Sequence, residues 1–223
     1  MKKILTTAIL CAGLVGFTAC DSFLDEDPKS SLTLDTYYKT SADIIGNVNY
    51  LYRDGAPDKM GNMTGAYRGS SLSVMNMVTG YFVNEYEGQE VDCSYARQLT
   101  RQDFTQSCCN YLTNDTWKSC YKSINVANAV IKYVDGVEMD NQAQYKAEAR
   151  FFRALNYFYL VKMFGDVPMV TEPTEDATLV EYPTRTAASE VFNTVIIPDL
   201  QFAVENLPNA TFAGNSHRVT KYA

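Results

Sequence analysis

The 223-residue sequence has only one histidine, His217, and one tryptophan, Trp117. A single histidine disfavours any catalytic or metal site that needs two imidazole groups, and a Ser/His/Asp set could be built only through His217. No glycine-rich phosphate loop follows a strand pattern, and no Walker motif occurs. The sequence therefore predicts no cofactor, no metal site and no catalytic residue.

Positive charge is also scarce. The chain has 19 lysine and arginine residues against 26 acidic residues, which gives a formal charge of −7. Removal of residues 1–19 would take away two lysines and no acid, and would lower the charge to −9. Because proteins bind nucleic acids through basic side chains that neutralise phosphates, a nucleic-acid partner is disfavoured.

The apolar run at the N-terminus is too short to cross a membrane. It spans Ile4–Phe17, whereas a spanning helix needs about 20 residues. The run follows two lysines and leads into a Thr-Ala pair before Cys20, the pattern of a bacterial lipoprotein signal. We therefore expect residues 1–19 to be a signal peptide, Cys20 to be lipidated and residues 20–39 to be an acidic tether. The alternative is an ordinary secretory signal.

The sequence contains no C-x-x-C motif, which disfavours a zinc ribbon or a thioredoxin-like redox site. An exported chain permits disulfides, but the sequence does not choose among the three pairings open to the four cysteines that follow Cys20. The other interpretation is that these thiols are simply buried. The four are Cys93, Cys108, Cys109 and Cys120.

Helical periodicity in the first half of the chain begins near Thr40, which can form a capping box with Asp43. The helix that this box opens should end at Gly55. A second, core-facing helix is predicted from about Ser70 to Phe82. Residues 85–106 are polar and show no clear period, so we expect a loop that contributes to binding.

Three further helices are predicted in the second half. Asn114 and Asp115 would cap the first, which should end near Gly136. The second, from about Asn141 to Phe164, is apolar around most of its circumference and should be buried. The third is predicted from about Ala187 to Asn206. Since no segment shows the alternation of a strand, the fold class is all-α.

The buried helix carries Arg150 and Arg153 on its remaining polar strip. These arginines could bind an anionic ligand. We expect them instead to pair with acidic residues of neighbouring helices, because the guanidinium fork matches a carboxylate. They are therefore predicted to hold helices together.

Aromatic spacing predicts a scaffold of tetratricopeptide-like repeats. Trp117 and Tyr121 resemble the start of one unit, and Ala147 with Phe151 resembles its second helix. Such units stack as antiparallel helix pairs and bury their faces against neighbours. The last residues look like the beginning of another helix, so we expect residues 40–223 to form a helical domain that is incomplete at its C-terminus.

Six ordered motifs run along the chain. They are Cys20-x-x-Phe23-Leu24-Asp25-x-x-Pro28, Trp117-x-x-x-Tyr121-x-x-Ile124-Asn125-x-Ala127-Asn128, Glu148-Ala149-Arg150-Phe151-Phe152-Arg153-Ala154-Leu155, Tyr159-Leu160-Val161-x-x-Phe164-Gly165-Asp166-Val167-Pro168, Pro198-Asp199-Leu200-x-x-Ala203-x-x-x-Leu207-Pro208 and Arg218-Val219-Thr220-Lys221. Together these motifs resemble the N-terminal part of the SusD/RagB family of outer-membrane lipoproteins. Several motifs in the right order are more specific than any one of them. Family members are usually longer than this sequence.

This resemblance implies a binding protein and not an enzyme. Its implied place is the outer membrane, lipid-anchored and exposed at the cell surface. Its implied partners are an oligosaccharide or other nutrient and a SusC-type TonB-dependent transporter that receives it. The residues themselves leave two alternatives open: a helical-repeat adaptor that binds only protein, and a surface glycan hydrolase, which would need two acids about 5–9.5 Å apart.

The resemblance also indicates where a ligand would bind. In the family, ligand contacts often come from the segment before the helix that starts with the W…Y motif, and residues 81–98 occupy that place. Tyrosine rings can lie against the C–H face of a pyranose, and amide or guanidinium groups can bind hydroxyl pairs. The alternative is that these tyrosines are packing or surface residues. The candidate ligand-binding residues are Asn84, Tyr86, Tyr95 and Arg97.

Overall fold

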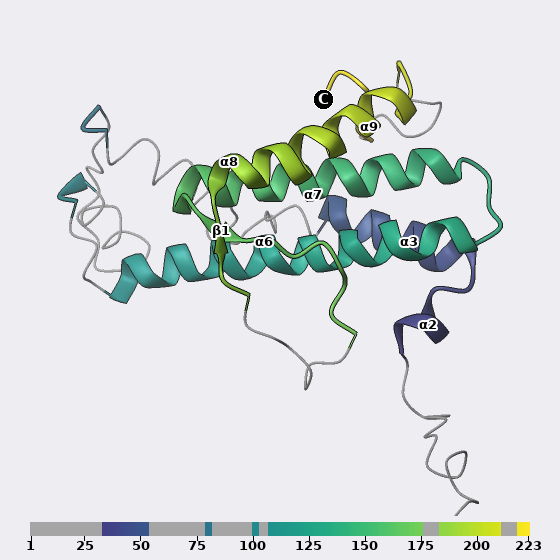
Figure 1. Ribbon diagram of the computed structural model, residues 1–223, viewed down its shortest axis with the longest axis horizontal. Helices are drawn as coiled ribbons and strands as arrows, with labels where there is room; N and C mark the ends of the chain where they lie inside the picture. The colour runs from purple at the N-terminus through teal and green to yellow at the C-terminus, as the bar shows by residue number, and fades with distance from the viewer. Residues whose placement is uncertain (1–32, 54–78, 82–99, 103–106, 176–182, 211–217) are drawn as a thin grey trace, which may run out of the picture. The chain divides into compact units, whose positions relative to one another are not determined.

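The fold is seen in a computed structural model (Figure 1). Helices dominate the part of the chain that it describes, and the strands there form one short ladder, so the all-α prediction is confirmed. The described residues are 33–53, 79–81, 100–102, 107–175, 183–210 and 218–223.

An antiparallel hairpin of α6 (Ser107–Tyr133) and α7 (Gln142–Phe164) forms the centre of the fold (Figure 1). A 3₁₀ turn, η2 (Val134–Gly136), ends α6 at the predicted glycine. The side chain of Gln142 closes the connection, because its Nε2 donates to the carbonyl oxygens of Val134 and Val137 at 2.8 and 3.0 Å. The hairpin is thus fixed at its turn by side-chain bonds to the backbone carbonyl groups at the end of α6.

Two further helices pack against this hairpin. Helix α3 (Ser41–Arg53) contacts both α6 and α7, and α9 (Ile197–Asn206) lies along α7. The predicted capping box of α3 is present: the Thr40 amide donates to Asp43 Oδ2 at 2.8 Å, and the Asp43 amide donates to Thr40 Oγ1 at 3.4 Å. These stacked antiparallel helices are the repeat-like scaffold that the sequence predicted.

Helix α7 ends where the sequence predicted. Gly165 has a φ of 69°, a left-handed conformation that glycine adopts without steric cost. Its amide donates to the Val161 carbonyl oxygen at 2.9 Å. The prediction that this helix ends at a glycine is therefore confirmed.

Helix α6 begins earlier than predicted, and the prediction that Asn114 and Asp115 cap it is wrong. The helix starts at Ser107, so both residues lie inside its first three turns. Asparagine and aspartate cost only a few tenths of a kcal/mol more than average residues in a helix interior. A continuous ladder of backbone hydrogen bonds outweighs that cost.

The last predicted helix is interrupted. It consists of α8 (Ala188–Val191), a π-helical turn η4 (Phe192–Ile196) and α9. Pro198 stands at the beginning of α9. Because proline lacks an amide hydrogen and its ring crowds the preceding turn, the wider π-helical turn accommodates it without ending the helix.

The strands that the sequence did not predict are two residues each. Strand β1 (Val167–Pro168) pairs antiparallel with β2 (Arg185–Thr186), with Val167 opposite Thr186. Two residues are too few to show alternation in a sequence. The ladder brings Asp166 to the beginning of α8, where its Oδ1 accepts a hydrogen bond from the Ala188 amide at 3.0 Å.

Apolar side chains of the described residues fill two large clusters around the hairpin and a small third one, formed by Ala147, Ala203 and Leu207. Each fully buried Leu, Ile or Val side chain contributes about 1.5–3 kcal/mol of burial free energy, so these clusters account for most of the packing. The first joins α2 (Leu34–Tyr37) and α3 to the hairpin and includes Tyr38, Ile44, Val48, Leu51, Val130 and Phe152. The second joins the hairpin to β1, α8 and η4 and includes Ile124, Tyr157, Leu160, Val167 and Val195.

The packed unit begins at Leu34. Tyr38, which follows α2, is 6% exposed, and its ring stacks on that of Tyr133 with centroids 5.2 Å apart. Burial, more than the neighbouring Tyr37 and Asp43, raises the pKa of the Tyr38 hydroxyl above its usual range. Residues 34–39, at the end of the expected tether, thus belong to the helical unit.

Candidate functional site

The residues that the sequence singled out for lipidation and ligand binding lie outside the described residues, and their roles stay predictions. Tyr81, at the start of the predicted binding segment, is described. It follows Gly80, whose φ is 78°, and its side chain is 88% exposed. The predicted core helix up to Phe82 is therefore wrong at Tyr81, because a left-handed turn turns the ring toward solvent. The residues outside are Cys20, Asn84, Tyr86, Tyr95 and Arg97.

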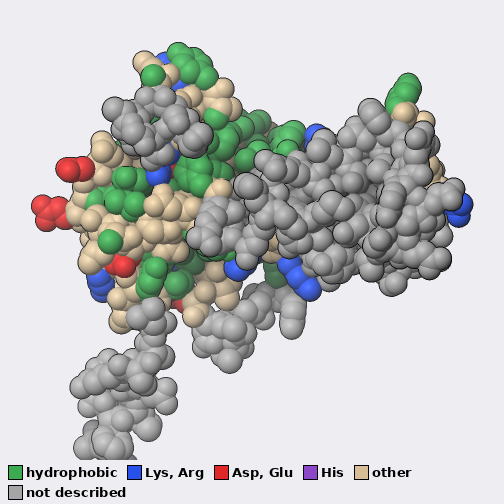
Figure 2. All heavy atoms as spheres, turned by 180° about the vertical axis from the view of Figure 1, so that it is seen from behind, with side chains coloured by type: hydrophobic (Ala, Val, Ile, Leu, Met, Phe, Trp, Pro, Cys, Tyr) green, Lys and Arg blue, Asp and Glu red, His purple; other side chains and the backbone are tan. Residues whose placement is uncertain are grey.

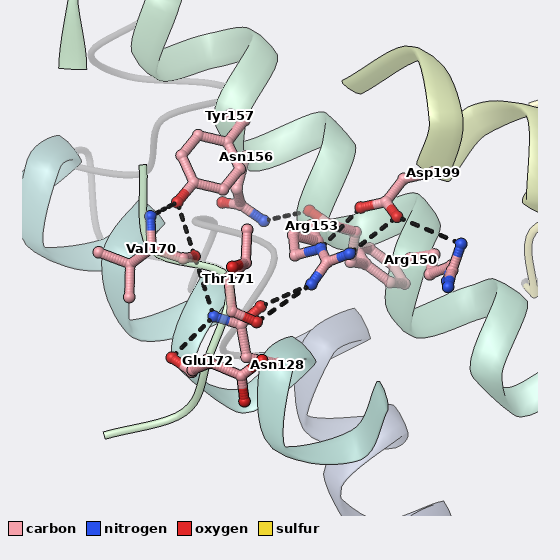
Figure 3. Close-up of polar contacts among 10 residues, drawn as sticks. Asn128, Arg150, Arg153, Asn156, Tyr157, Val170, Thr171, Glu172 and Asp199 are labelled. Carbon is pink, nitrogen blue, oxygen red and sulfur yellow. Dashed lines mark hydrogen bonds and ion pairs between the residues drawn. The ribbon is translucent and has the colours of Figure 1, made fainter. Parts of the chain in front are cut away.

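A buried polar network surrounds Arg153, near the middle of α7 (Figure 3). Its Nε and Nη2 donate to Oδ2 and Oδ1 of Asp199 on α9 at 2.6 and 2.9 Å. Its Nη1 donates to Asn128 Oδ1 on α6 at 2.9 Å. The carboxylate is 2% exposed and the arginine 8% exposed. One guanidinium group therefore joins three helices.

Arg150 lies one helical turn earlier and has a looser contact with the same carboxylate. Its Nη1 is 3.8 Å from Asp199 Oδ1 (Figure 3). Its guanidinium lies over the Phe202 ring at 4.3 Å. The prediction that both arginines pair with an acid of a neighbouring helix is confirmed.

An extended segment, residues 167–174, is attached to the same network by side chains. The Tyr157 hydroxyl donates to the Val170 carbonyl oxygen at 2.8 Å and accepts from the Val170 amide at 2.7 Å (Figure 3). Asn128 Nδ2 donates to the carbonyl oxygens of Val170 and Glu172 at 3.0 and 3.2 Å. Burial raises the pKa of Tyr157 to about 12. Side chains thus satisfy backbone groups that a longer sheet would otherwise satisfy.

A second buried ion pair joins α7 to the last described residues. Arg218 Nε donates to Glu148 Oε1 at 3.0 Å and Nη2 to Glu148 Oε2 at 2.5 Å. The guanidinium carbon lies 5.1 and 5.2 Å from the ring centroids of Tyr52 and Tyr145. Burial would lower the pKa of Arg218, but the hydrogen bonds and charge of Glu148 raise it. Its Nη1 also donates to Asn49 Oδ1 at 2.8 Å.

Both buried carboxylates, Glu148 and Asp199, are therefore bound by arginine through two nitrogen atoms. A carboxylate whose two oxygens both accept hydrogen bonds from a guanidinium group has little capacity left for a ligand. The two pairs are structural, and they connect motifs that lie far apart in the sequence. The sequence predicted an acidic partner for Arg153 but gave no signal for the pairing of Glu148 with Arg218.

Of the four cysteines that follow Cys20, the structure decides between a disulfide and a buried thiol for one. Cys120 is a free, buried thiol on α6. Burial raises its pKa to about 12, so it stays protonated at neutral pH. It is therefore an apolar packing residue, which is the second of the two interpretations that the sequence left open.

Two further observations concern the distribution of basic side chains and the apolar character of the helices. On the described part of the face in Figure 2, lysine and arginine side chains lie singly among apolar and other side chains. Among the described residues, no helix combines the length and the apolar character that crossing a membrane requires.

Comparison with known proteins places the chain. A SusD-like family model described as "Starch-binding associating with outer membrane" matches residues 22–223. SusD-like protein P2 of Formosa agariphila is 29% identical over 216 residues, which cover 96% of this chain and 40% of that protein.

Solved structures show the same fold. A SusD superfamily protein from Parabacteroides distasonis superposes with a TM-score of 0.60 at 24% identity, over 79% of this chain and 36% of that one. A laminarin-binding SusD-like protein superposes with a TM-score of 0.63 at 23% identity, over 82% of this chain and 38% of that one.

The chain spans about 40% of the length of the curated relative P2, and a smaller share of the two solved chains. The family model nevertheless covers nearly all of it, and the fold agrees. The chain therefore belongs to the SusD-like family, whose members are described as starch-binding and associated with the outer membrane.

Proposed function

We propose that the protein is a surface lipoprotein of the outer membrane that binds oligosaccharides and passes them to a SusC-type TonB-dependent transporter. The match of the SusD-like family model to residues 22–223 is the observation that carries this proposal. The relative of known fold that binds laminarin supports a carbohydrate ligand. Binding without turnover is the expected activity.

The proposed ligand-binding residues are those that the sequence indicated: Asn84, Tyr86, Tyr95 and Arg97. Their support is the place of their segment, directly before α6. The exposed ring of Tyr81 at the start of that segment adds an aromatic surface of the required kind.

Titration calorimetry with maltohexaose and laminarihexaose tests this site. Tyr86→Ala and Tyr95→Ala should each weaken binding by about 1–3 kcal/mol, by analogy with the loss of one stacked base. Tyr222→Ala is the control, since Tyr222 is an exposed tyrosine near the end of the chain. Wild-type affinity in the double variant would remove both tyrosines from the site. Release of shorter sugars would indicate a hydrolase instead.

The anchor and the partner are tested in cells. Cys20→Ala should move the protein from the membrane fraction to the soluble fraction, and Cys120→Ala is the matched cysteine control. Mild-detergent purification of the native protein should recover a TonB-dependent transporter. Retention of the Cys20→Ala protein in the membrane would contradict the anchor. Purification that yields other proteins but no transporter would favour an adaptor.

A further inference from the structure

A hollow of about 710 Å³ lies between the beginning of α3 and the beginning of α7. We call it the Tyr145 hollow. Its volume falls within the range of sites that hold small molecules, about 300–1,000 Å³. Three of its lining side chains are apolar or aromatic: Ile45 from α3, Met139 from the α6–α7 connection and Tyr145 from α7.

The polar side chains of the hollow are unengaged. Within the described part of the chain, no hydrogen bond or ion pair engages the side chains of Glu138, Asp140 or Asn141, and Asn141 does not cap α7. The nearby acid Asp135 differs from them, because its carboxylate forms an ion pair with Lys146. The hollow therefore brings together exposed carboxylate and amide groups that have no hydrogen-bonding partner within the described part of the chain.

The backbone and the ring at the hollow are held in place. Asn141 has a φ of 57°, a left-handed conformation that is uncommon outside glycine and that sets the direction of the chain entering α7. Its carbonyl oxygen accepts the Tyr145 amide at 3.1 Å. The Tyr145 ring contacts the Arg218 guanidinium, which Glu148 fixes. A ring held in this way loses little conformational entropy when a ligand binds.

Charge narrows the class of ligand. Glu138 and Asp140 would repel an anion, and the amide end of α3 is already capped by Asp43. A single metal ion would leave most of this volume empty, and no cluster of three metal-binding side chains occurs among the described residues. Carboxylate and amide groups beside an aromatic ring suit an uncharged, polyhydroxylated ring.

We propose that the Tyr145 hollow binds one sugar residue of an uncharged oligosaccharide. The Tyr145 ring contacts the C–H face of the sugar, and Glu138, Asp140 and Asn141 bind its hydroxyl groups. This contact region is formed by other residues than the segment proposed above, so the two can be tested apart although they share a ligand class.

Amide chemical shifts of the whole ¹⁵N-labelled chain test the proposal. The probes are hexasaccharides of glucose, galactose, mannose and xylose, with hexagalacturonate as the acidic comparison. The neutral probes should cause saturable shifts in residues 138–145, and hexagalacturonate should not. Asn141→Gly keeps the left-handed backbone but removes the amide, and Asp140→Ala removes one carboxylate. Each substitution should raise the Kd of the neutral probe, as obtained from the shifts of residues 138–145, about tenfold. This is the effect of losing one good hydrogen bond.

The matched control is Glu205→Ala, which removes an exposed acid from α9 and should leave these shifts unchanged. Melting temperatures of all variants separate loss of binding from loss of folding. No saturable shift at residues 138–145 with any neutral probe would overturn the proposal, as would equal shifts with hexagalacturonate. Binding elsewhere on the chain without these shifts overturns the hollow and leaves the proposed function intact. Hollow shifts that persist in the Tyr86→Ala/Tyr95→Ala double variant support the hollow independently of the other site.

Discussion

The Arg153 site and the Arg218 site have the same chemistry and hold very different parts of the molecule. In both, a guanidinium group binds a buried carboxylate through two nitrogens. Arg153 lies mid-helix on α7 and joins α6, α9 and the extended segment. Arg218 lies in a short segment near the end of the chain. In the same segment, the Val219 amide donates a hydrogen bond to the Tyr52 hydroxyl.

The difference shows that an ion pair's contribution depends on what else fixes its two partners. Arg153 and Asp199 are both held by helices that pack closely, so neither charge can reach water if the other is removed. Glu148 is equally fixed, but Arg218 belongs to a segment that can move away into solvent. We therefore expect a global loss of stability at the first site and a local release at the second.

The largest effect is expected at Arg153. Arg153→Met should lower the free energy of unfolding by about 3–5 kcal/mol, because the buried Asp199 charge loses both of its close hydrogen bonds and keeps only the looser contact with Arg150. The double variant Arg153→Met/Asp199→Leu should recover most of this loss, since it removes both charges. Urea unfolding followed by circular dichroism measures both values. Arg150→Met is the control on the same helix, and an equal loss there would contradict the assigned role of Arg153.

A smaller and local effect is expected at the second site. Glu148→Gln should lower the free energy of unfolding by about 1–3 kcal/mol, the range for charged hydrogen bonds. Hydrogen exchange should become much faster at the Val219 amide and stay nearly unchanged in the middle of α7. If the amides of α7 and α9 exchanged faster to the same degree, the two sites would not differ as described.

The next effect is expected at alkaline pH, in the network around Arg153 to which Tyr157 belongs. The folded-state pKa of Tyr157 is raised by burial from 10 to about 12. A raised pKa means that the stabilisation is fully present below pH 10 and is lost as pH rises from 10 toward 12. For one group the loss is up to about 1.4 kcal/mol per pH unit.

Urea unfolding between pH 9 and 11 measures this slope. The Cys120→Ala background removes the thiol, whose pKa is also raised to about 12 and whose loss begins at lower pH. In that background, Tyr157→Phe should reduce the slope above pH 10 by the contribution of one tyrosine, since Tyr38, Tyr52, Tyr121 and Tyr133 also have raised pKa values. An unchanged slope would show that Tyr157 does not titrate with unfolding.

The smallest effect is expected at the edge of the Arg218 site. Asn49 is exposed and accepts one hydrogen bond from Arg218. Asn49→Ala should change stability by less than about 0.5 kcal/mol, as most exposed substitutions do. Thermal unfolding against the wild type measures it. A loss comparable with that of Glu148→Gln would mean that Asn49 and not Glu148 orients the arginine.

Local signals in the sequence predicted local features well. The capping box of Thr40 and Asp43 and the end of α7 at Gly165 appear where expected, because each depends on residues within one helical turn. The same holds for the class of the fold, since helical periodicity is itself a local property. The early start of α6 at Ser107 was missed, since a residue that favours a cap is also tolerated inside a helix.

By itself the sequence determined the all-α class, most helix ends and the motifs that resemble the family. It also predicted that the arginines of α7 would have acidic partners. Only the tertiary structure decided that the partner of Arg153 is Asp199, 46 positions later, and that the buried acid Glu148 pairs with Arg218, 70 positions later. The hollow that Ile45 of α3 and Tyr145 of α7 line together was decided in the same way, because these two helices are distant in sequence. The physical reason is that burial and distance select one partner among many acids, and both arise only when helices distant in sequence pack together.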